Sequence, residues 1–353
     1  MRSVISSTLL SLVRCPACHG ALAGEPARLT CQSCGRQYGG PSADFLDLRP
    51  HESFDERTKY LDEALHADAR YESVSPPFLG SKIRNDMLRA FLAPQSGDLV
   101  VDLGCGSGRA LWWNRDWRAQ AVGIDISPFF AREARQAVDL LLGDLRRLPF
   151  ADATFTKAYS LDVLEHLSPA ALRGMLTEAA RVLAPGGQLF VYTHVRKNAR
   201  IAQGLRWINR LAQRLDRMGA IDLHQEHLRK SDHLNPLADI PELRRVAADT
   251  GFRIRKIRYY TPIVGGFVEN ILMRVAEKRL ATRAQRNAGG TRGAMTNDAA
   301  LKAARAAGKE RVARSATTRA VLTALSAAMK LDLLLFGRIE SGPFFALLER
   351  SAE

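Results

Sequence analysis

The stretch Leu99-Val-Val-Asp-Leu-Gly-Cys-Gly-Ser-Gly-Arg109 is the part of the sequence that decides the expected fold. Its first half is a short apolar run, rich in valine, of the kind that forms a strand buried on both faces. Alternate glycines follow at positions 104, 106 and 108. Because glycine has no Cβ, a ligand can approach such a turn closely and meet the amides of the next helix, expected over residues 109–118. The stretch therefore predicts a strand, a ligand-binding turn and a helix.

A dinucleotide site is the first alternative for this turn. The fingerprint G-x-G-x-x-G needs its third glycine one position after Gly108, where this chain has Arg109. An NAD site is therefore the weaker interpretation. A glycine-rich turn alone does not establish a nucleotide-type site, so the strands that follow have to decide the matter.

An acidic residue, Asp125, ends the second apolar run, Ala121-Val-Gly-Ile124. It follows Gly104 by 21 residues, the spacing at which the neighbouring strand of a doubly wound sheet places a carboxylate against a ribose. A carboxylate can accept hydrogen bonds from both vicinal hydroxyls. The alternative is that Asp125 caps a helix starting near Pro128, although Ser127 suits that role better.

Two further apolar runs, 138–142 and 155–160, end in Gly143-Asp144 and Leu161-Asp162. Open α/β sheets bind their ligands at the carboxyl ends of such strands. Together with the later run Arg181-Val-Leu-Ala-Pro-Gly-Gly187, these motifs resemble, in order, those of the class I S-adenosylmethionine-dependent methyltransferases. The resemblance extends from about Lys82 to Glu277.

The resemblance implies a Rossmann-like, doubly wound α/β fold with a seven-stranded, mostly parallel sheet. An antiparallel hairpin would end the sheet, and we expect its strands over the runs 252–260 and 267–276. The resemblance also implies that the strand ends hold S-adenosylmethionine. Asp102 with Gly104, Gly106 and Gly108 would hold the amino-acid end, Asp125 and Ile126 the ribose, Asp144 and Leu145 the adenine, and Leu161 and Asp162 the methionine arm.

Four of the five cysteines form a C-x2-C-x12-C-x2-C array, Cys15, Cys18, Cys31 and Cys34. Two such pairs offer four thiolates at tetrahedral reach, which suits a structural Zn²⁺ ion that leaves no open position for catalysis. The metal would fold a small domain that lacks a core of its own. Two disulfides are the alternative, and a reducing compartment disfavours them.

A zinc ribbon ahead of a methyltransferase domain resembles the architecture of bacterial 23S rRNA guanine methyltransferases. It is also similar to ribbon-fused methyltransferases of unassigned substrate. The rRNA enzymes would have a histidine among their zinc ligands where this chain has Cys34. RNA therefore stays open as a substrate.

Two basic segments suggest a partner with negative charge, in a chain of net charge +14. In the stretch 201–218, Ile201, Leu205, Ile208, Ala212 and Leu215 share one helical face, opposite four arginines at 206, 210, 214 and 217. The tail 274–319 has 12 basic and 3 acidic residues. Both segments suit an anionic membrane surface or RNA. The alternative for the helix is that it packs on its own domain with a solvated basic face.

Histidines follow the fifth strand, expected over 188–193, where this family builds its acceptor pocket. Methyl transfer needs a base only when the acceptor starts protonated, and a histidine near its free pKa suits that task. His194 and His227 are the candidates for the catalytic base, with His233 and His166 behind them. A hydrogen-bonded structural histidine is the alternative for each. A metal site at His224 and His227, three residues apart, is disfavoured, because no third ligand follows at a suitable spacing.

The chain divides into five expected parts: a zinc ribbon at 1–48, a linker and helix at 49–97, a methyltransferase domain at 98–276 with an insertion at 195–237, a basic disordered linker at 277–319 and a C-terminal helical segment at 320–353. No apolar run could span a membrane. We expect a cytoplasmic protein, able to associate with the inner face of the membrane. It would methylate a metabolite, glycan or lipid-linked intermediate; RNA methylation and a non-catalytic cofactor-binding module are the alternatives.

Overall fold

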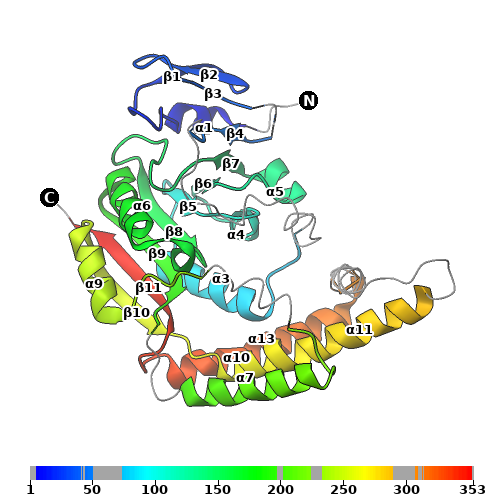
Figure 1. Ribbon diagram of the computed structural model, residues 1–353. Coiled ribbons are helices and arrows are strands. Elements are labelled where there is room, and N and C mark those ends of the chain that lie inside the picture. The colour runs from blue at the N-terminus through cyan, green and yellow to red at the C-terminus, as the bar shows by residue number, and fades with distance from the viewer. Residues whose placement is uncertain are drawn as a thin grey trace.

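A mostly parallel sheet forms the centre of the computed structural model, which describes residues 5–40, 42, 44–50, 74–196, 202–223, 233–288, 307–308, 312 and 314–351. Within these residues the sheet has eight strands in the order β10-β11-β9-β8-β5-β6-β7-β4. Among these eight strands only β11 runs in the opposite direction, antiparallel to both β9 and β10. The predicted α/β fold is confirmed (Figure 1). The strands are β4 (Leu46–Asp47), β5 (Leu99–Leu103), β6 (Gln120–Asp125), β7 (Asp139–Leu142), β8 (Phe155–Leu161), β9 (Leu183–His194), β10 (Phe252–Tyr259) and β11 (Pro343–Arg350).

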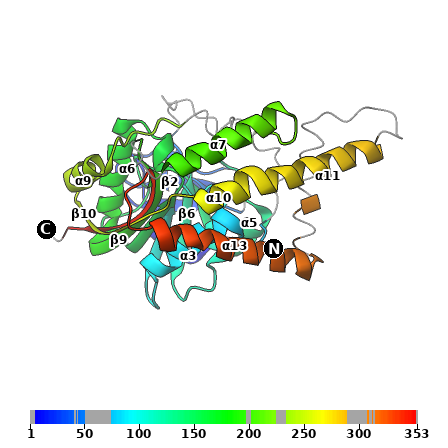
Figure 2. The same cartoon turned by 90° about the horizontal axis from the view of Figure 1, so that it is seen from below.

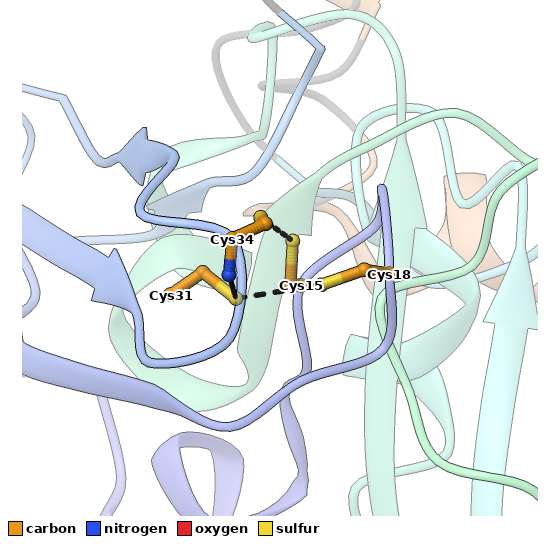
Figure 3. A group of neighbouring side chains, drawn as sticks. All are labelled: Cys15, Cys18, Cys31 and Cys34. Carbon is orange, nitrogen blue, oxygen red and sulfur yellow. Dashed lines mark hydrogen bonds between the residues drawn. The ribbon is translucent and has the colours of Figure 1, made fainter.

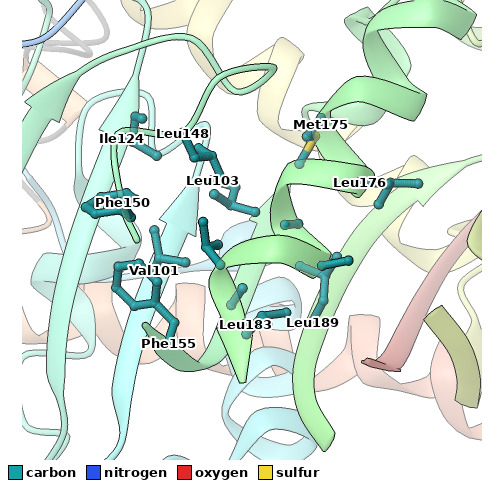
Figure 4. Packing of buried hydrophobic residues seen from close by; sticks show 14 of the residues in the cluster. Val101, Leu103, Ile124, Leu148, Phe150, Phe155, Met175, Leu176, Leu183 and Leu189 are labelled. Atoms are coloured by element: carbon teal, nitrogen blue, oxygen red, sulfur yellow. The ribbon is translucent and has the colours of Figure 1, made fainter. Parts of the chain in front are cut away.

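Helices cover both faces of the sheet, as expected for parallel strands that are apolar on both sides. One face carries α6 (Pro169–Val182) and α9 (Ile240–Asp249), and the other carries α3 (Leu79–Leu92), α4 (Arg109–Trp113) and α5 (Arg132–Ala137). Figure 4 shows Val101 and Leu103 of β5 between the neighbouring strands and α6. The predicted helix over 109–118 is wrong beyond Trp113, because Asn114 ends it by donating its side-chain amide to the Ala110 carbonyl.

The N-terminal module is joined to this sheet. It contains α1 (Ser7–Leu12) and a three-stranded antiparallel sheet of β1 (Leu22–Glu25), β2 (Arg28–Cys31) and β3 (Gln37–Tyr38). The chain that leaves the module then forms β4, which pairs in parallel with β7. The expected seven strands therefore become eight among the described residues, because the module supplies an edge strand.

The predicted strand over 267–276 is wrong. This stretch runs through α10 (Ile263–Phe267), a π-helix η3 (Val268–Leu272) and α11 (Met273–Ala288). Val268 and Ile271 are buried three residues apart, so the apolar pattern has a helical period. The disordered linker expected from residue 277 is accordingly helical to Ala288, and positions 289–306 lie outside the described residues.

The sheet instead takes its last strand from the C-terminus. The helix predicted over 320–353 is found as α13 (Ala316–Phe336), whereas Pro343–Arg350 form β11 between β9 and β10. β10 and β11 are antiparallel neighbours, but α10, η3, α11 and α13 separate them in the sequence. The predicted terminal hairpin is therefore wrong in its connection, although its antiparallel pairing is present.

Three long helical segments form a layer at the end of the molecule farthest from the N-terminal module (Figure 1). α7 (Ala202–Arg217), the continuous run α10–η3–α11 and α13 lie side by side, as Figure 2 shows from below. Ala212 of α7 is buried against Ile271 of η3. The predicted basic helix thus packs on its own domain. No helix in the described part of the chain is long and apolar enough to cross a bilayer.

Candidate active site

A cavity of about 360 Å³ lies at the carboxyl ends of β5, β6, β7 and β8. The structure brings nine of the predicted cofactor-binding residues together in its lining: Asp102, Gly104, Gly106, Asp125, Ile126, Asp144, Leu145, Leu161 and Asp162. Gly108 is not in the lining. A Cβ at Gly108 would lie 2.9 Å from the Ala134 Cβ, so this glycine allows α5 to pack against the turn.

The glycine turn depends on Gly104 for its shape. Gly104 has φ 81°, and a Cβ there would lie only 2.5 Å from Val163 Cγ2. The absence of this Cβ lets the loop after β8 approach the turn. α4 is only five residues long, and its first residues, Arg109 and Ala110, line the cavity together with the turn.

Asp125 reaches the glycine turn from the neighbouring strand. Its Oδ2 accepts the Gly106 N–H at 2.7 Å, and its Oδ1 accepts the Ser127 N–H at 2.9 Å. Burial raises the pKa of Asp125, whereas these amides lower it. The helix-cap alternative is wrong for Asp125 and for Ser127, because α5 begins at Arg132 and Ala131 occupies its N-cap position. Each Asp125 oxygen keeps a second lone pair for a ligand hydroxyl.

Asp102 is the most buried acid of the cavity, at 2% exposure. Burial raises its pKa well above the usual value, and the nearby Asp125 charge raises it further. No cation pairs with Asp102 among the described residues. A cationic ligand group in the cavity would supply that partner.

Asp144 already has a cationic neighbour. The Arg146 guanidinium lies 2.9 Å from Asp144 Oδ2, and the Arg146 N–H donates to Oδ1. Any adenine amino group would therefore share this carboxylate with Arg146. Leu145 lines the cavity beside it.

Arg84 enters the cavity from α3, and the sequence interpretation missed it. Its Nε lies 3.2 Å from Asp162 Oδ2, and the guanidinium lies over the Tyr192 ring. Burial lowers the pKa of Arg84, but the charges of Asp162, Tyr192, Glu269 and Tyr260 together outweigh that effect and raise the pKa overall. A signal existed in the sequence, because Arg84 lies on the helix expected just ahead of the first strand.

A histidine cluster lies at the ends of β8 and β9. The His233 ring centroid is 4.6 Å from that of His166 and 5.4 Å from that of His194. Glu165, which sequence reasoning missed, is buried beside them, and its Oε1 lies 3.9 Å from His194 Nδ1. Burial raises the pKa of Glu165 to about 8, and the Asp162 charge contributes. The other predicted base, His227, lies outside the described residues together with His224.

The four N-terminal cysteines converge from two loops (Figure 3). Sγ of Cys15 lies 3.7 Å from Sγ of Cys34, and Sγ of Cys18 lies 3.5 Å from Sγ of Cys31. Zinc–sulfur bonds of about 2.3 Å place the sulfurs of a tetrahedron about 3.8 Å apart, so these spacings fit the metal. They are too long for the alternative disulfides, and all four cysteines are free.

Known proteins are similar to this chain over the part that forms the cavity. A family model described as a methyltransferase domain matches residues 101–191, which run from β5 to β9. "Probable tRNA methyltransferase 9B" of Mus musculus is 34% identical over 134 residues, 37% of this chain and 30% of that protein. "Malonyl-[acyl-carrier protein] O-methyltransferase" of Erwinia pyrifoliae is 40% identical over 102 residues, 27% of this chain and 36% of that protein.

A third relative acts, by its name, on another kind of acceptor. "Sterol 4-C-methyltransferase strm-1" of Caenorhabditis elegans is 25% identical over 172 residues, 44% of this chain and 50% of that protein. The chain thus spans half or less of the length of these relatives. All three relatives are named as methyltransferases, but each name gives a different acceptor.

Proposed function

We propose that this chain, which carries a class I S-adenosylmethionine-dependent methyltransferase domain, transfers the methyl group of S-adenosylmethionine to a small-molecule acceptor. The observation that carries the proposal is the cavity in which Asp102, the glycine turn and Asp125 meet. Asp125 would accept the ribose hydroxyls, and the buried Asp102 would face the cationic amino-acid end. The bound cofactor would supply the methyl group on its sulfonium.

The chain's own residues would contribute by positioning the acceptor against the methyl group and by removing the acceptor's proton. With the cofactor bound, an acceptor oxygen or nitrogen would attack the methyl carbon in line, the carbon–sulfur bond would break, and its electron pair would stay on sulfur. The base that removes the acceptor's proton would be His194, at the end of β9, or His227. Arg84 and Asp162 would fix the methionine arm by their ion pair at the cavity.

Calorimetry tests the cofactor site. Titration with S-adenosylmethionine and with S-adenosylhomocysteine should give one site per chain. Asp125→Asn removes the charge that accepts hydrogen bonds, and should weaken binding at least about tenfold, since a hydrogen bond to a charged group contributes about 1.5–3 kcal/mol. Asp249→Asn, an exposed carboxylate paired with Arg173, is the matched control. Wild-type protein that binds neither nucleoside would exclude the proposal.

The acceptor that we favour is reached at a membrane surface, as a lipid-linked intermediate would be. On the outward side of α7, Trp207 is 68% exposed, and Met218, which follows the helix, is 73% exposed. The arginines of the same helix are also exposed and have no ion pair with any described residue: Arg206, Arg210, Arg214 and Arg217. Apolar side chains flanked by arginines suit the headgroup region of an anionic bilayer.

α13 lies in the same layer, on the other side of α10 from α7, and it also has exposed apolar side chains. Leu334 and Leu335 are 73% and 60% exposed near its C-terminus. α13 also packs against α3. An ion pair joins the two helices, with Lys330 Nζ 2.6 Å from Asp86 Oδ2. The helix that carries Arg84 into the cavity thus rests on the layer that would meet the lipid.

Vesicle flotation tests this surface. The protein should float with vesicles that contain phosphatidylglycerol and not with pure phosphatidylcholine, and added salt should weaken the binding. Arg206→Gln with Arg210→Gln should abolish flotation. Arg244→Gln with Arg245→Gln, which removes the same charge from α9, should not. Equal loss in both double variants would show that only net charge matters and would contradict an α7 surface.

RNA is the second candidate acceptor, and the basic composition of residues 274–319 favours it. Incubation of the protein with labelled methyl donor and fractionated cell extract distinguishes the two. Label in the lipid fraction supports the first proposal, and label in RNA supports the second. Nucleic acid that stays bound through purification, and is lost when 289–319 are deleted, would also favour RNA. Cofactor binding with no labelled fraction would favour a non-catalytic module.

We also propose that Cys15, Cys18, Cys31 and Cys34 bind one structural Zn²⁺ ion. Four thiolates fill a tetrahedral zinc site, so this ion would have no open position for chemistry. The sulfur spacings near 3.6 Å described above support the assignment.

A further inference from the structure

Three metal-ligating side chains meet beside the cavity from two separate parts of the chain. Glu165 and His166 belong to η2 (Leu164–His166), which follows β8, and His233 precedes α9. One ligand atom of each residue lies within 4.8 Å of both others. Only His166 lines the cavity itself. The cluster therefore lies at the border of the cofactor cavity.

Hydrogen bonds hold the cluster in place. Thr193 Oγ1 donates to Glu165 Oε2 at 2.8 Å, which leaves Oε1 facing the imidazoles. The Asn235 N–H donates to the Glu165 backbone carbonyl at 2.9 Å, so the segment that carries His233 is fastened to η2. Metal ligands are commonly oriented by such a second set of hydrogen bonds.

Asn235 is held next to the cluster, because its side-chain amide also donates to the His233 backbone carbonyl. Its backbone has φ 47°, in the left-handed region, and its Oδ1 is buried without a hydrogen-bond partner among the described residues. A buried carbonyl oxygen without a partner is unfavourable. A cation, or water bound to a cation, would satisfy it.

We propose that Glu165, His166 and His233 bind a divalent transition-metal ion at the acceptor side of the cavity. Two imidazoles and one carboxylate are the ligands of Zn²⁺, Mn²⁺ and Fe²⁺ rather than of Ca²⁺ or Mg²⁺, which prefer oxygen. Three protein ligands leave coordination positions open, unlike the four cysteines of the N-terminal module. The cluster and the cysteines are therefore two metal sites of different character.

The role of this ion rests on the proposed function, whereas its binding does not. An acceptor oxygen that occupies an open position would be held beside the methyl group, and its proton would be easier to remove. His194, whose Nδ1 lies 3.9 Å from Glu165 Oε1, would be the base that receives that proton.

Cobalt provides a probe that distinguishes the two sites. The full-length protein is treated with EDTA and titrated with Co²⁺. Cobalt bound to thiolates gives an intense near-ultraviolet charge-transfer band, whereas cobalt bound to imidazole and carboxylate gives only weak visible bands. We expect one equivalent of the second kind in the wild-type protein.

Two variants assign that equivalent to the cluster. Glu165→Gln keeps the size of the side chain and can still accept from Thr193, but its neutral amide is a poor metal ligand. The metal-free variant should therefore melt at the wild-type temperature, yet lose the weak cobalt bands. His233→Ala should lose them as well. Glu25→Gln, on exposed β1 of the N-terminal module, should keep them.

Two results would overturn the inference: wild-type protein that shows only thiolate-bound cobalt, or Glu165→Gln and His233→Ala proteins that bind cobalt as wild type does. Titration of the same samples with S-adenosylmethionine keeps this failure separate from that of the proposed function. A wild-type protein that binds the nucleoside but shows only thiolate-bound cobalt refutes only the metal site. A protein that binds cobalt but no nucleoside refutes only the methyltransferase proposal.

Discussion

Asp125 has two roles at the scale of single residues. Its carboxylate accepts the Gly106 N–H and so fixes the turn that follows β5, and the same group faces the cavity. The turn is thus shaped before any ligand arrives, which lowers the entropy cost of binding. Gly104 completes this arrangement, since its missing Cβ leaves room for Val163.

Gly104→Ala should destabilise the protein more than Gly106→Ala. Both residues have positive φ, which costs alanine about 1–2 kcal/mol. A Cβ at Gly104 would also overlap Val163, whereas nothing lies within 4 Å of a Cβ at Gly106. Overpacking costs typically about 1–3 kcal/mol more. Urea unfolding measures both variants, and equal losses of unfolding free energy would contradict the close approach of Val163.

His194→Ala should lower turnover by at least about a hundredfold, the usual contribution of a general base. Its affinity for S-adenosylmethionine, measured by calorimetry, should not change. The same measurement on His227→Ala tests the other candidate base. His19→Ala, in the N-terminal module, is the control. Lost cofactor affinity in the His194 variant would instead assign this residue to the cofactor site.

The residues of the cavity differ in how far a sequence can reveal them. Asp102 and Asp125 lie at the carboxyl ends of β5 and β6, so strand ends and spacing locate them. Glu165 carries no such signal, because its place beside His233 depends on a contact between distant segments. Arg84 reaches the cavity only through the packing of α3 on the sheet.

At the scale of elements, β11 is the strand whose position the sequence did not reveal. Its residues Phe344, Phe345 and Ala346 are fully buried between β9 and β10. A continuous apolar run is compatible with a buried strand or a buried helix. The choice is made by pairing partners that lie far away in the sequence, and no local pattern contains them.

A chain that stops at Gly342 should fail to fold into a soluble protein. Each large side chain of β11 contributes about 1.5–3 kcal/mol by burial, and four of them approach the net stability of a domain, about 5–15 kcal/mol. The truncation would also expose two strand edges. Soluble yield and a thermal melt provide the measurement, with a chain that stops at Ser351 as the control. A soluble, cooperatively melting product would contradict the central position of β11.

At the scale of the whole molecule, the N-terminal module and the sheet share one hydrophobic core. Leu9 and Val13 of the module belong to the same buried cluster as Phe150 and Leu141. The Arg14 N–H donates to the Pro149 carbonyl at 2.8 Å, and Ser6 Oγ donates to Asp139 at 2.6 Å. The cysteine spacing predicted the module, but nothing in the sequence showed that its chain also extends the main sheet. Unfolding of the module should therefore lower the stability of the methyltransferase domain.

Cys31→Ser tests this coupling, because it removes one zinc ligand and leaves the histidine cluster intact. If zinc folds the module, loss of the ion unfolds it. Leu46 at the sheet edge and the core side chains beneath α1, which are buried in the folded protein, then become exposed. We expect the main calorimetric transition to fall by more than about 5 °C, since each kcal/mol shifts the melting temperature of a domain of this size by roughly 2–4 °C. A separate early transition with the main one unmoved would show that the module melts alone. Added Zn²⁺ should restore EDTA-treated wild-type protein but not the variant, because the variant lacks the fourth thiolate.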